Sequence, residues 1–291
     1  MKPVIGVNFP RVSAERLEDT VKQVAGFGFE AAEYNLSDHP LIVGGTVCRP
    51  YVEFVKSAIR AAPLVFTAHI GTGLNLRNTA DFKVHKDTLF SSIDICDMLD
   101  MRTITVHYED KSMHVDIEQA FLDVHLEAAE YAQKKGVLVC IENIEIDHYQ
   151  NVLDMVKTAN HQNFRMTLDL GHLNLSTNFY GQVFLDAVRE CAPYVRHLHI
   201  SDNTGHFEKL RLTDFLLYAT LPMGPRIAFG SGDIHIPPFW GVIDIMAALR
   251  LLKDAGYDGI FLCEYYNAMY NPFNKEIQEN VRNKISALFG D

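Results

Sequence analysis

The chain has 291 residues, of which 26 are Lys or Arg and 37 are Asp or Glu, giving a formal net charge of −11 with His neutral. An acidic surface repels nucleic acid and offers no polybasic region to an anionic membrane, so the composition argues against both as partners. The sequence contains no apolar run of the roughly 18 residues that a membrane span needs, and we expect a soluble, cytoplasmic protein. Five scattered cysteines without C-x-x-C spacing argue against a disulfide framework and a zinc ribbon.

Eight short apolar or β-branched runs, each separated from the next by enough chain for a helix, set the predicted order of elements. We expect strands at 3–8, 29–35, 64–69, 103–108, 137–142, 165–169, 195–200 and 259–264. Helical periodicity covers 14–26, 50–61, 82–98, 115–134, 149–159, 181–190 and 241–254. The pattern predicts an α/β fold, a single-domain (β/α)8 TIM barrel over residues 1–291. The irregular segment 201–241 is expected to be a loop over the barrel mouth.

Polar side chains end most of these runs, at the C-terminal ends of strands where TIM barrels place their catalytic groups. Alternate residues of a barrel strand point inward, which places these side chains at one level of the mouth above smaller or apolar ones. Several carboxylates at one mouth would repel each other unless a cation neutralised them, and mixed Glu, Asp and His ligands favour Mn²⁺, Zn²⁺, Co²⁺ or Mg²⁺. The residues concerned are His69, His107, Glu142, Asp169, His199 and Glu264, with Asn8 and either Glu33 or Asn35 from the first two strands.

Each of these residues also has an ordinary structural explanation. A single histidine at a strand end is usually a hydrogen-bonded core or loop residue, and Asp169 in LDLGH could simply cap the helix that follows. Convergence on one level, rather than any one residue, favours a functional site. Five other histidines lie in helical or loop stretches, and we expect them on the surface: His85, His114, His125, His148 and His161.

The order and spacing of these motifs resemble the xylose-isomerase-like TIM-barrel superfamily. That superfamily includes sugar isomerases and epimerases, inosose dehydratases and endonuclease IV-type apurinic-site nucleases. The resemblance covers nearly the whole chain and is specific for the superfamily rather than for one activity. The motifs that carry it are HIG at 69–71, TVHY with His107, IEN at 141–143, LDLGH at 168–172, HLHISD at 197–202, GSGDIH at 230–235 and CEYY at 263–266.

In the ketose epimerases of this superfamily, a Glu, an Asp, a His and a second Glu from strands five to eight hold one divalent metal. Those positions match Glu142, Asp169, His199 and Glu264, so the resemblance implies these four residues as metal ligands. We expect one divalent ion, Mn²⁺ first, with Zn²⁺, Co²⁺ or Mg²⁺ as alternatives. Substrate contacts are expected from His69, His107, His172, Glu33, Arg226 and His235.

The leading prediction is a metal-dependent isomerase or epimerase that acts on a ketose or a related sugar or polyol carbonyl compound. The metal would bind the carbonyl and a neighbouring hydroxyl and stabilise the enediolate formed when the proton leaves. Glu142 and Glu264 are the expected catalytic residues, one removing the proton and the other returning it on the opposite face. Arg226 would bind a phosphate or carboxylate if the substrate has one, which the sequence leaves open. The resemblance also implies a homo-oligomer.

The sequence leaves two other activities open. A zinc-dependent, endonuclease IV-like phosphodiester hydrolase is supported by His69 and His107, which match two histidines of the three-zinc cluster in that branch. The third zinc of that cluster needs an Asp-x-His upstream of the G-x-G, whereas here Asp233 and His235 lie within and after it, which weighs against the trinuclear site. A lyase of the inosose-dehydratase type would use the same metal and the same first proton abstraction, so the sequence does not separate it from an isomerase.

Overall fold

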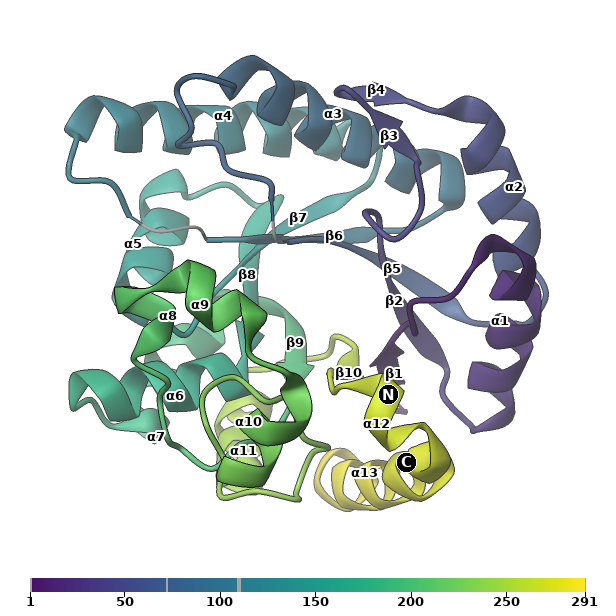
Figure 1. Ribbon diagram of the computed structural model, residues 1–291, viewed down its shortest axis with the longest axis vertical. Helices are drawn as coiled ribbons and strands as arrows, with labels where there is room; N and C mark the ends of the chain where they lie inside the picture. Colours follow the sequence, from purple (N-terminus) through teal and green to yellow (C-terminus); the bar gives the residue numbers. More distant parts are fainter. Residues whose placement is uncertain (1, 72, 109–110, 291) are drawn as a thin grey trace.

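Eight parallel strands close into a barrel in the order β1-β10-β9-β8-β7-β6-β5-β2 (Figure 1). The computed structural model describes residues 2–71, 73–108 and 111–290. All eight predicted strands are present and the predicted TIM barrel is confirmed. The barrel strands are β1 (Ile5–Asn8), β2 (Ala31–Asn35), β5 (Val65–Ile70), β6 (Thr103–His107), β7 (Leu138–Glu142), β8 (Phe164–Asp169), β9 (Val195–Ile200) and β10 (Phe261–Cys263).

Helices surround the barrel, and every predicted helical stretch contains one (Figure 1). These are α1 (Leu17–Gly26, preceded by the 3-10 turn η1, Ala14–Arg16), α2 (Arg49–Ile59), α3 (Phe82–Leu99), α4 (Val115–Gln133), α5 (Tyr149–Ala159), α7 (Phe184–Cys191) and α11 (Ile245–Asp254). Within the described residues, no helix combines the length and the apolar character needed to cross a membrane. Outside the segment 201–241, the elements not predicted are α6 (Leu170–Tyr180), α12 (Asn267–Tyr270), α13 (Asn274–Phe289), the 3-10 turns η2 (Ala192–Tyr194) and η3 (Asn271–Phe273), and the hairpin of β3 (Ile42–Val43) with β4 (Thr46–Val47).

The segment 201–241 is more ordered than the sequence indicates. It contains three short helices, α8 (Leu210–Thr213), α9 (Phe215–Thr220) and α10 (Met223–Phe229), which lie beside the barrel opening in Figure 1. Helices of one or two turns are too short to show a periodic apolar pattern, which explains why the expectation of an irregular loop was wrong here. An antiparallel bridge between Asp202 and Ile236 then brings the chain back to the end of β9.

The side chains that point into the barrel are the alternate strand residues predicted to do so. Thr105 and Thr167 hydrogen-bond across it at 2.9 Å, and the Thr67 hydroxyl donates to Glu33 Oε2 at 3.2 Å. Outside this interior, the apolar residues of the strands pack under the helices, as expected for a parallel sheet covered on its outer face.

His125 on α4 was expected on the surface, and that prediction is wrong. The side chain is buried against Phe121 and Phe164, and its Nδ1 pairs with the Phe121 carbonyl at 2.7 Å. An apolar face of a long helix can bury a histidine when one ring nitrogen finds a backbone partner within the same helix.

Candidate metal centre at the barrel mouth

Four neighbouring strands bring the predicted metal ligands to one level of the mouth. His107 pairs with Glu142 across β6 and β7, and Asp169 pairs with His199 across β8 and β9. Glu264 directly follows β10, which pairs with β9. One ligand atom from each of Glu142, Asp169, His199 and Glu264 can be chosen so that all lie within 4.8 Å of one another.

His199 lies at the centre of this group, which we call the main cluster. Its Nδ1 is 2.9 Å from both Glu142 Oε1 and Glu264 Oε2. Burial works to lower the pKa of His199, but Glu33, Glu264 and Glu142 raise it well above its ordinary value. Burial alone would raise the pKa of Glu264, whereas His199 lowers it to about 2. A positive charge on His199 therefore balances the carboxylates around it.

Asp169 has two different environments for its two carboxylate oxygens. Oδ1 accepts a hydrogen bond from the His172 backbone N–H at 2.5 Å, so it caps the N-terminus of α6. Oδ2 is buried and has no hydrogen-bond partner among the described residues. A buried carboxylate oxygen without a donor is costly unless a cation contacts it. The capping role and the ligand role of Asp169 thus use different oxygens.

The pKa of Asp169 reflects this environment. Burial raises the pKa to about 7; nearby His172 opposes the rise, and Glu264 and Glu142 add to it. The repulsion among carboxylates expected from the sequence is therefore present at this oxygen. The donor set and the unpartnered oxygen both fit a divalent cation.

A second cluster shares Glu142 with the main cluster. His69 Nε2 lies 3.2 Å from Glu142 Oε2, and His107 Nε2 lies 3.3 Å from the same oxygen. The two histidine Nε2 atoms are 3.2 Å apart. Glu142 thus has one oxygen toward His199 and the other toward this histidine pair, and it could bridge two cations.

A third cluster forms where the loop after β9 folds back. Asp233 Oδ2 lies 2.8 Å from His235 Nε2 and 3.4 Å from His172 Nε2. Burial works to lower the pKa of His235, and Asp233 overcomes it to raise the value to about 10. The position of Asp233 and His235 relative to the G-x-G weighed against a third zinc in the sequence. The structure brings both residues to His172, where the three side chains form a group of possible metal ligands.

His235 has a positive φ of 41°, a backbone region that non-glycine residues rarely adopt. Two contacts hold it there: the Tyr266 N–H donates to the His235 carbonyl at 2.9 Å, and the next residue, Ile236, bridges to Asp202. Strain of this kind persists where surrounding structure enforces it, often at functional sites. The spacing of the motif letters gives no signal of this conformation.

The clusters open into a cavity of about 880 Å³ at the mouth. Its lining includes all the predicted substrate contacts except Arg226. That residue donates through Nη2 to the Tyr218 hydroxyl at 2.5 Å and to the Asp233 carbonyl at 2.6 Å.

Arg211 of α8 is the cation from the 201–241 segment that lines the cavity, and it pairs with Glu145 at 2.8 Å. Nothing in the sequence marks Arg211 as a residue of the cavity wall, and its place there follows from the fold of α8. Six members of the three clusters line the cavity: His69, His107, His172, Asp233, His235 and Glu264.

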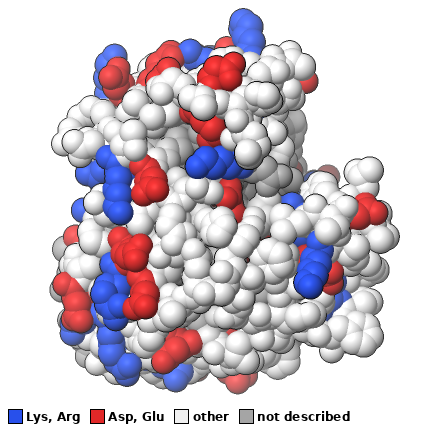
Figure 2. All heavy atoms as spheres, turned by 90° about the vertical axis from the view of Figure 1, so that its left-hand side faces the viewer, with Lys and Arg blue, Asp and Glu red and all other residues white. Residues whose placement is uncertain are grey.

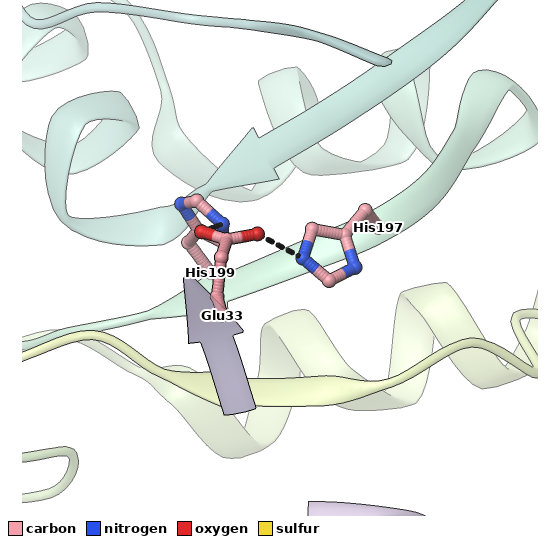
Figure 3. Close-up of side chains that lie close together, drawn as sticks. All are labelled: Glu33, His197 and His199. Carbon is pink, nitrogen blue, oxygen red and sulfur yellow. Dashed lines mark hydrogen bonds and ion pairs between the residues drawn. The ribbon is translucent and has the colours of Figure 1, made fainter. Parts of the chain in front are cut away.

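Glu33 was predicted to bind substrate, and it lies deeper than the other candidates. The side chain extends from β2 into the barrel beneath His199 and is 3% exposed (Figure 3). Its two oxygens lie against His197 and His199. Glu33, His197 and His199 also form a group of ligand atoms within 4.8 Å of one another.

A family model described as "Xylose isomerase-like TIM barrel" matches residues 21–285. The chain belongs to the xylose isomerase-like TIM-barrel family. This match confirms the resemblance drawn from the motifs.

Two proteins are similar to this chain in sequence over part of its length. The chain is 23% identical over 216 residues to an inosose isomerase of Bacillus licheniformis, covering 70% of this chain and 69% of that protein. It is 24% identical over 164 residues to an uncharacterised protein of Methanocaldococcus jannaschii, covering 54% of this chain and only 44% of that protein.

Solved structures agree on the fold along almost the whole chain. A D-psicose 3-epimerase with D-tagatose from Clostridium cellulolyticum H10 has a TM-score of 0.71 at 16% identity, with all of both chains covered. A xylose isomerase-like TIM-barrel protein from Mycobacterium smegmatis in complex with magnesium has a TM-score of 0.72 at 14% identity, covering 99% of this chain and 98% of that one. At these identities the likeness establishes the fold, while substrate and metal remain properties of those proteins.

Proposed function

We propose that this chain is a divalent-metal-dependent isomerase or epimerase acting on a ketose or a related sugar or polyol carbonyl compound. The observation that carries the proposal is the main cluster, in which two glutamates, an aspartate and a histidine meet beside an open cavity. The names of the inosose isomerase and D-psicose 3-epimerase relatives support this substrate class. A cavity of about 880 Å³ is large enough for a monosaccharide or an inosose.

Glu142, Asp169, His199 and Glu264 would hold the metal. When bound, a divalent ion supplies Lewis acidity, which acidifies the C–H between a carbonyl and a neighbouring hydroxyl. Two of the ligand atoms for this ion would be the buried Asp169 Oδ2, which has no hydrogen-bond partner among the described residues, and His199 Nδ1. Carboxylate oxygens with one imidazole favour Mn²⁺, Mg²⁺, Co²⁺ or Zn²⁺.

Glu142 and Glu264 would transfer the protons, and their side chains differ in exposure to the cavity. The Glu264 side chain is 19% exposed and lines the cavity, whereas the Glu142 side chain is 1% exposed. Its place on the cavity wall gives the Glu264 carboxylate the access to a substrate C–H that proton abstraction requires. We assign the first proton abstraction to Glu264. Glu142, with His69 and His107 against its second oxygen, would carry a proton of its own and deliver it to the opposite face, while Glu264 keeps the proton that it removed until solvent takes it.

The cavity wall offers groups that suit a polyhydroxylated substrate. His69, His107 and His172 present ring nitrogens that can donate to or accept from hydroxyl groups. Phe9 and Phe215 supply aromatic faces on which a sugar ring can pack. The charged groups near the opening include Arg11, Arg16 and Arg211.

Proton exchange tests the proposal directly. We expect deuterium to enter the position beside the carbonyl when the protein is incubated in D₂O with Mn²⁺ and a suitable ketose or inosose. Asp169→Asn should abolish the exchange, and Glu118→Gln on α4 serves as a matched carboxylate-to-amide control away from the cavity. NMR of the products separates an epimer from a dehydrated compound, and so an isomerase from a lyase. No exchange across a broad panel would contradict the proposal.

A second candidate is a hydrolase of phosphate esters with more than one metal. It is favoured by the second and third clusters, which place two further groups of three potential ligands beside the main one. Adjacent cations typically stabilise the attacking and leaving oxygens of a displacement at phosphorus. Two or three zinc ions per chain, with cleavage of bis(p-nitrophenyl) phosphate, would favour this activity over isomerisation.

Charge argues that such a hydrolase would act on a small substrate rather than on DNA. The net charge of −11 opposes binding to a polyanion. On the face shown in Figure 2, basic side chains lie beside acidic ones. Ion pairs such as Lys135 with Asp94 and Lys86 with Glu127 engage several of the lysines of the surface. The isomerase or epimerase therefore remains our first proposal.

A further inference from the structure

Glu33 connects the main cluster to the interior of the barrel. Its Oε1 lies 2.9 Å from His199 Nε2, and its Oε2 lies 2.9 Å from His197 Nε2 (Figure 3). Oε2 also accepts a hydrogen bond from the Thr67 hydroxyl at 3.2 Å. All four side chains are buried, with hydrogen bonds from His197 and Thr67 at Oε2 and an ion-pair contact with His199 at Oε1.

His199 uses its two ring nitrogens in different directions. Nδ1 faces Glu142 and Glu264 in the main cluster, and Nε2 faces Glu33 beneath it. The Nδ1 contact with Glu142 Oε1 is an aligned hydrogen bond, whereas Nε2 has no aligned partner despite its short distance to Glu33. The His199 ring is thus directed toward Glu142 more than toward Glu33.

Metal binding by His199 would determine which of its two ring nitrogens carries the proton. A neutral imidazole carries one proton, and a nitrogen that binds a metal cannot keep it. Ligation through Nδ1 therefore requires the proton on Nε2, where Glu33 Oε1 is the acceptor within reach. Metal-ligating histidines usually donate their other N–H to a carboxylate or carbonyl, which fixes the tautomer and the ring orientation.

We propose that Glu33 is a positioning residue that orients His199 for metal binding through Nδ1, and that His197 and Thr67 hold Glu33 in place for this task. The inference rests on the metal site of the proposed function. It assigns Glu33 a role different from substrate binding, because both of its carboxylate oxygens are already engaged by His197, His199 and Thr67.

The test measures metal affinity in Glu33→Gln, which keeps the shape of the side chain but removes its charge. Competition with a chromogenic chelator should show Mn²⁺ and Co²⁺ binding weakened by about 10–100-fold, the range typical of such supporting groups. The visible absorption spectrum of the Co²⁺-loaded variant should differ from that of the wild type, since His199 would be less firmly oriented. Glu118→Gln should leave both affinity and spectrum unchanged.

A purely structural role for Glu33 would lower the melting temperature of Glu33→Gln without changing metal affinity, and this outcome would overturn the inference. If Glu33→Gln does not fold, Thr67→Val replaces it, because that change removes only one donor to Glu33. Thr67→Val should weaken metal binding several-fold, and unchanged affinity would contradict the inference. Failure of the wild type to bind any divalent metal would instead refute the proposed function itself.

Discussion

Replacing Asp169 with asparagine should stabilise the metal-free protein while removing its metal. Asp169 is fully buried, and its pKa is raised from 3.8 to about 7 by burial and by Glu264 and Glu142, against the opposing effect of His172. Because this carboxyl has a higher pKa in the folded protein than in the unfolded chain, the free energy of unfolding falls as the pH rises from the unfolded-state pKa through the folded-state pKa. At about 1.4 kcal/mol for each tenfold change, the ionised side chain costs on the order of 4 kcal/mol.

Asparagine should avoid that cost without disturbing the local structure. Its carbonyl oxygen can take the place of Oδ1 and accept from the His172 N–H, so the cap of α6 remains. Its amide can occupy the place of the unpartnered Oδ2, beside Glu142 and Glu264, where it would donate rather than repel. The variant therefore resembles the protonated form of Asp169.

Urea denaturation in the presence of EDTA measures the effect. The advantage of Asp169→Asn over the wild type should grow from about 1–2 kcal/mol at pH 5 to about 4 kcal/mol at pH 8. Glu118→Gln should show the opposite sign, because Glu118 pairs with Arg77, which lowers its pKa against the effect of burial. A metal-free Asp169→Asn protein less stable than the wild type at pH 8 would refute the reasoning that uncompensated carboxylates meet at this site.

Glu142→Gln and Glu264→Gln are each expected to abolish turnover while circular dichroism shows an intact fold, and near-normal turnover in either would remove the two-glutamate mechanism. His107→Ala should lose far less bound metal than His199→Ala in atomic absorption, because His107 lies beside the main cluster; equal losses would indicate a second metal at Glu142. Apparent metal affinity should rise as pH increases above 6.5, because burial lowers the pKa of the ligand His199 but Glu33, Glu264 and Glu142 raise it well above its usual value, so His199 must release a proton to bind the metal; a flat profile by calorimetry would contradict this. Zinc-loaded protein should neither bind nor nick abasic duplex DNA at physiological salt, and cleavage that Asp169→Asn abolishes would support the nuclease activity instead.

The barrel and its main cluster were predictable because each depends on a local pattern. An apolar run of strand length ending in a polar residue marks both the strand and the level of its last side chain. In a closed parallel barrel those ends must meet, which is why Glu142, Asp169, His199 and Glu264 converge. Helix α6 escaped prediction because it begins directly at Leu170 with no break after the strand.

The third cluster was not predictable, since it depends on how a long segment folds back on the barrel. The bridge between Asp202 and Ile236 and the positive φ of His235 bring Asp233 to His172, and neither feature leaves a mark in the spacing of the residues. Arg226 was predicted to contact substrate because it is a cation in the segment expected over the barrel mouth. Its partners, the Tyr218 hydroxyl and the Asp233 carbonyl, appear only when α9 and α10 are folded.

Counting the metal ions bound per chain tests the central claim most directly. Protein stripped with chelator and dialysed against Mn²⁺ or Zn²⁺ should hold one tightly bound divalent ion by inductively coupled plasma mass spectrometry, and Asp169→Asn and His199→Ala should hold none. Absence of bound metal in the wild type, or one ion retained in both variants, would contradict a metal centre built on Glu142, Asp169, His199 and Glu264.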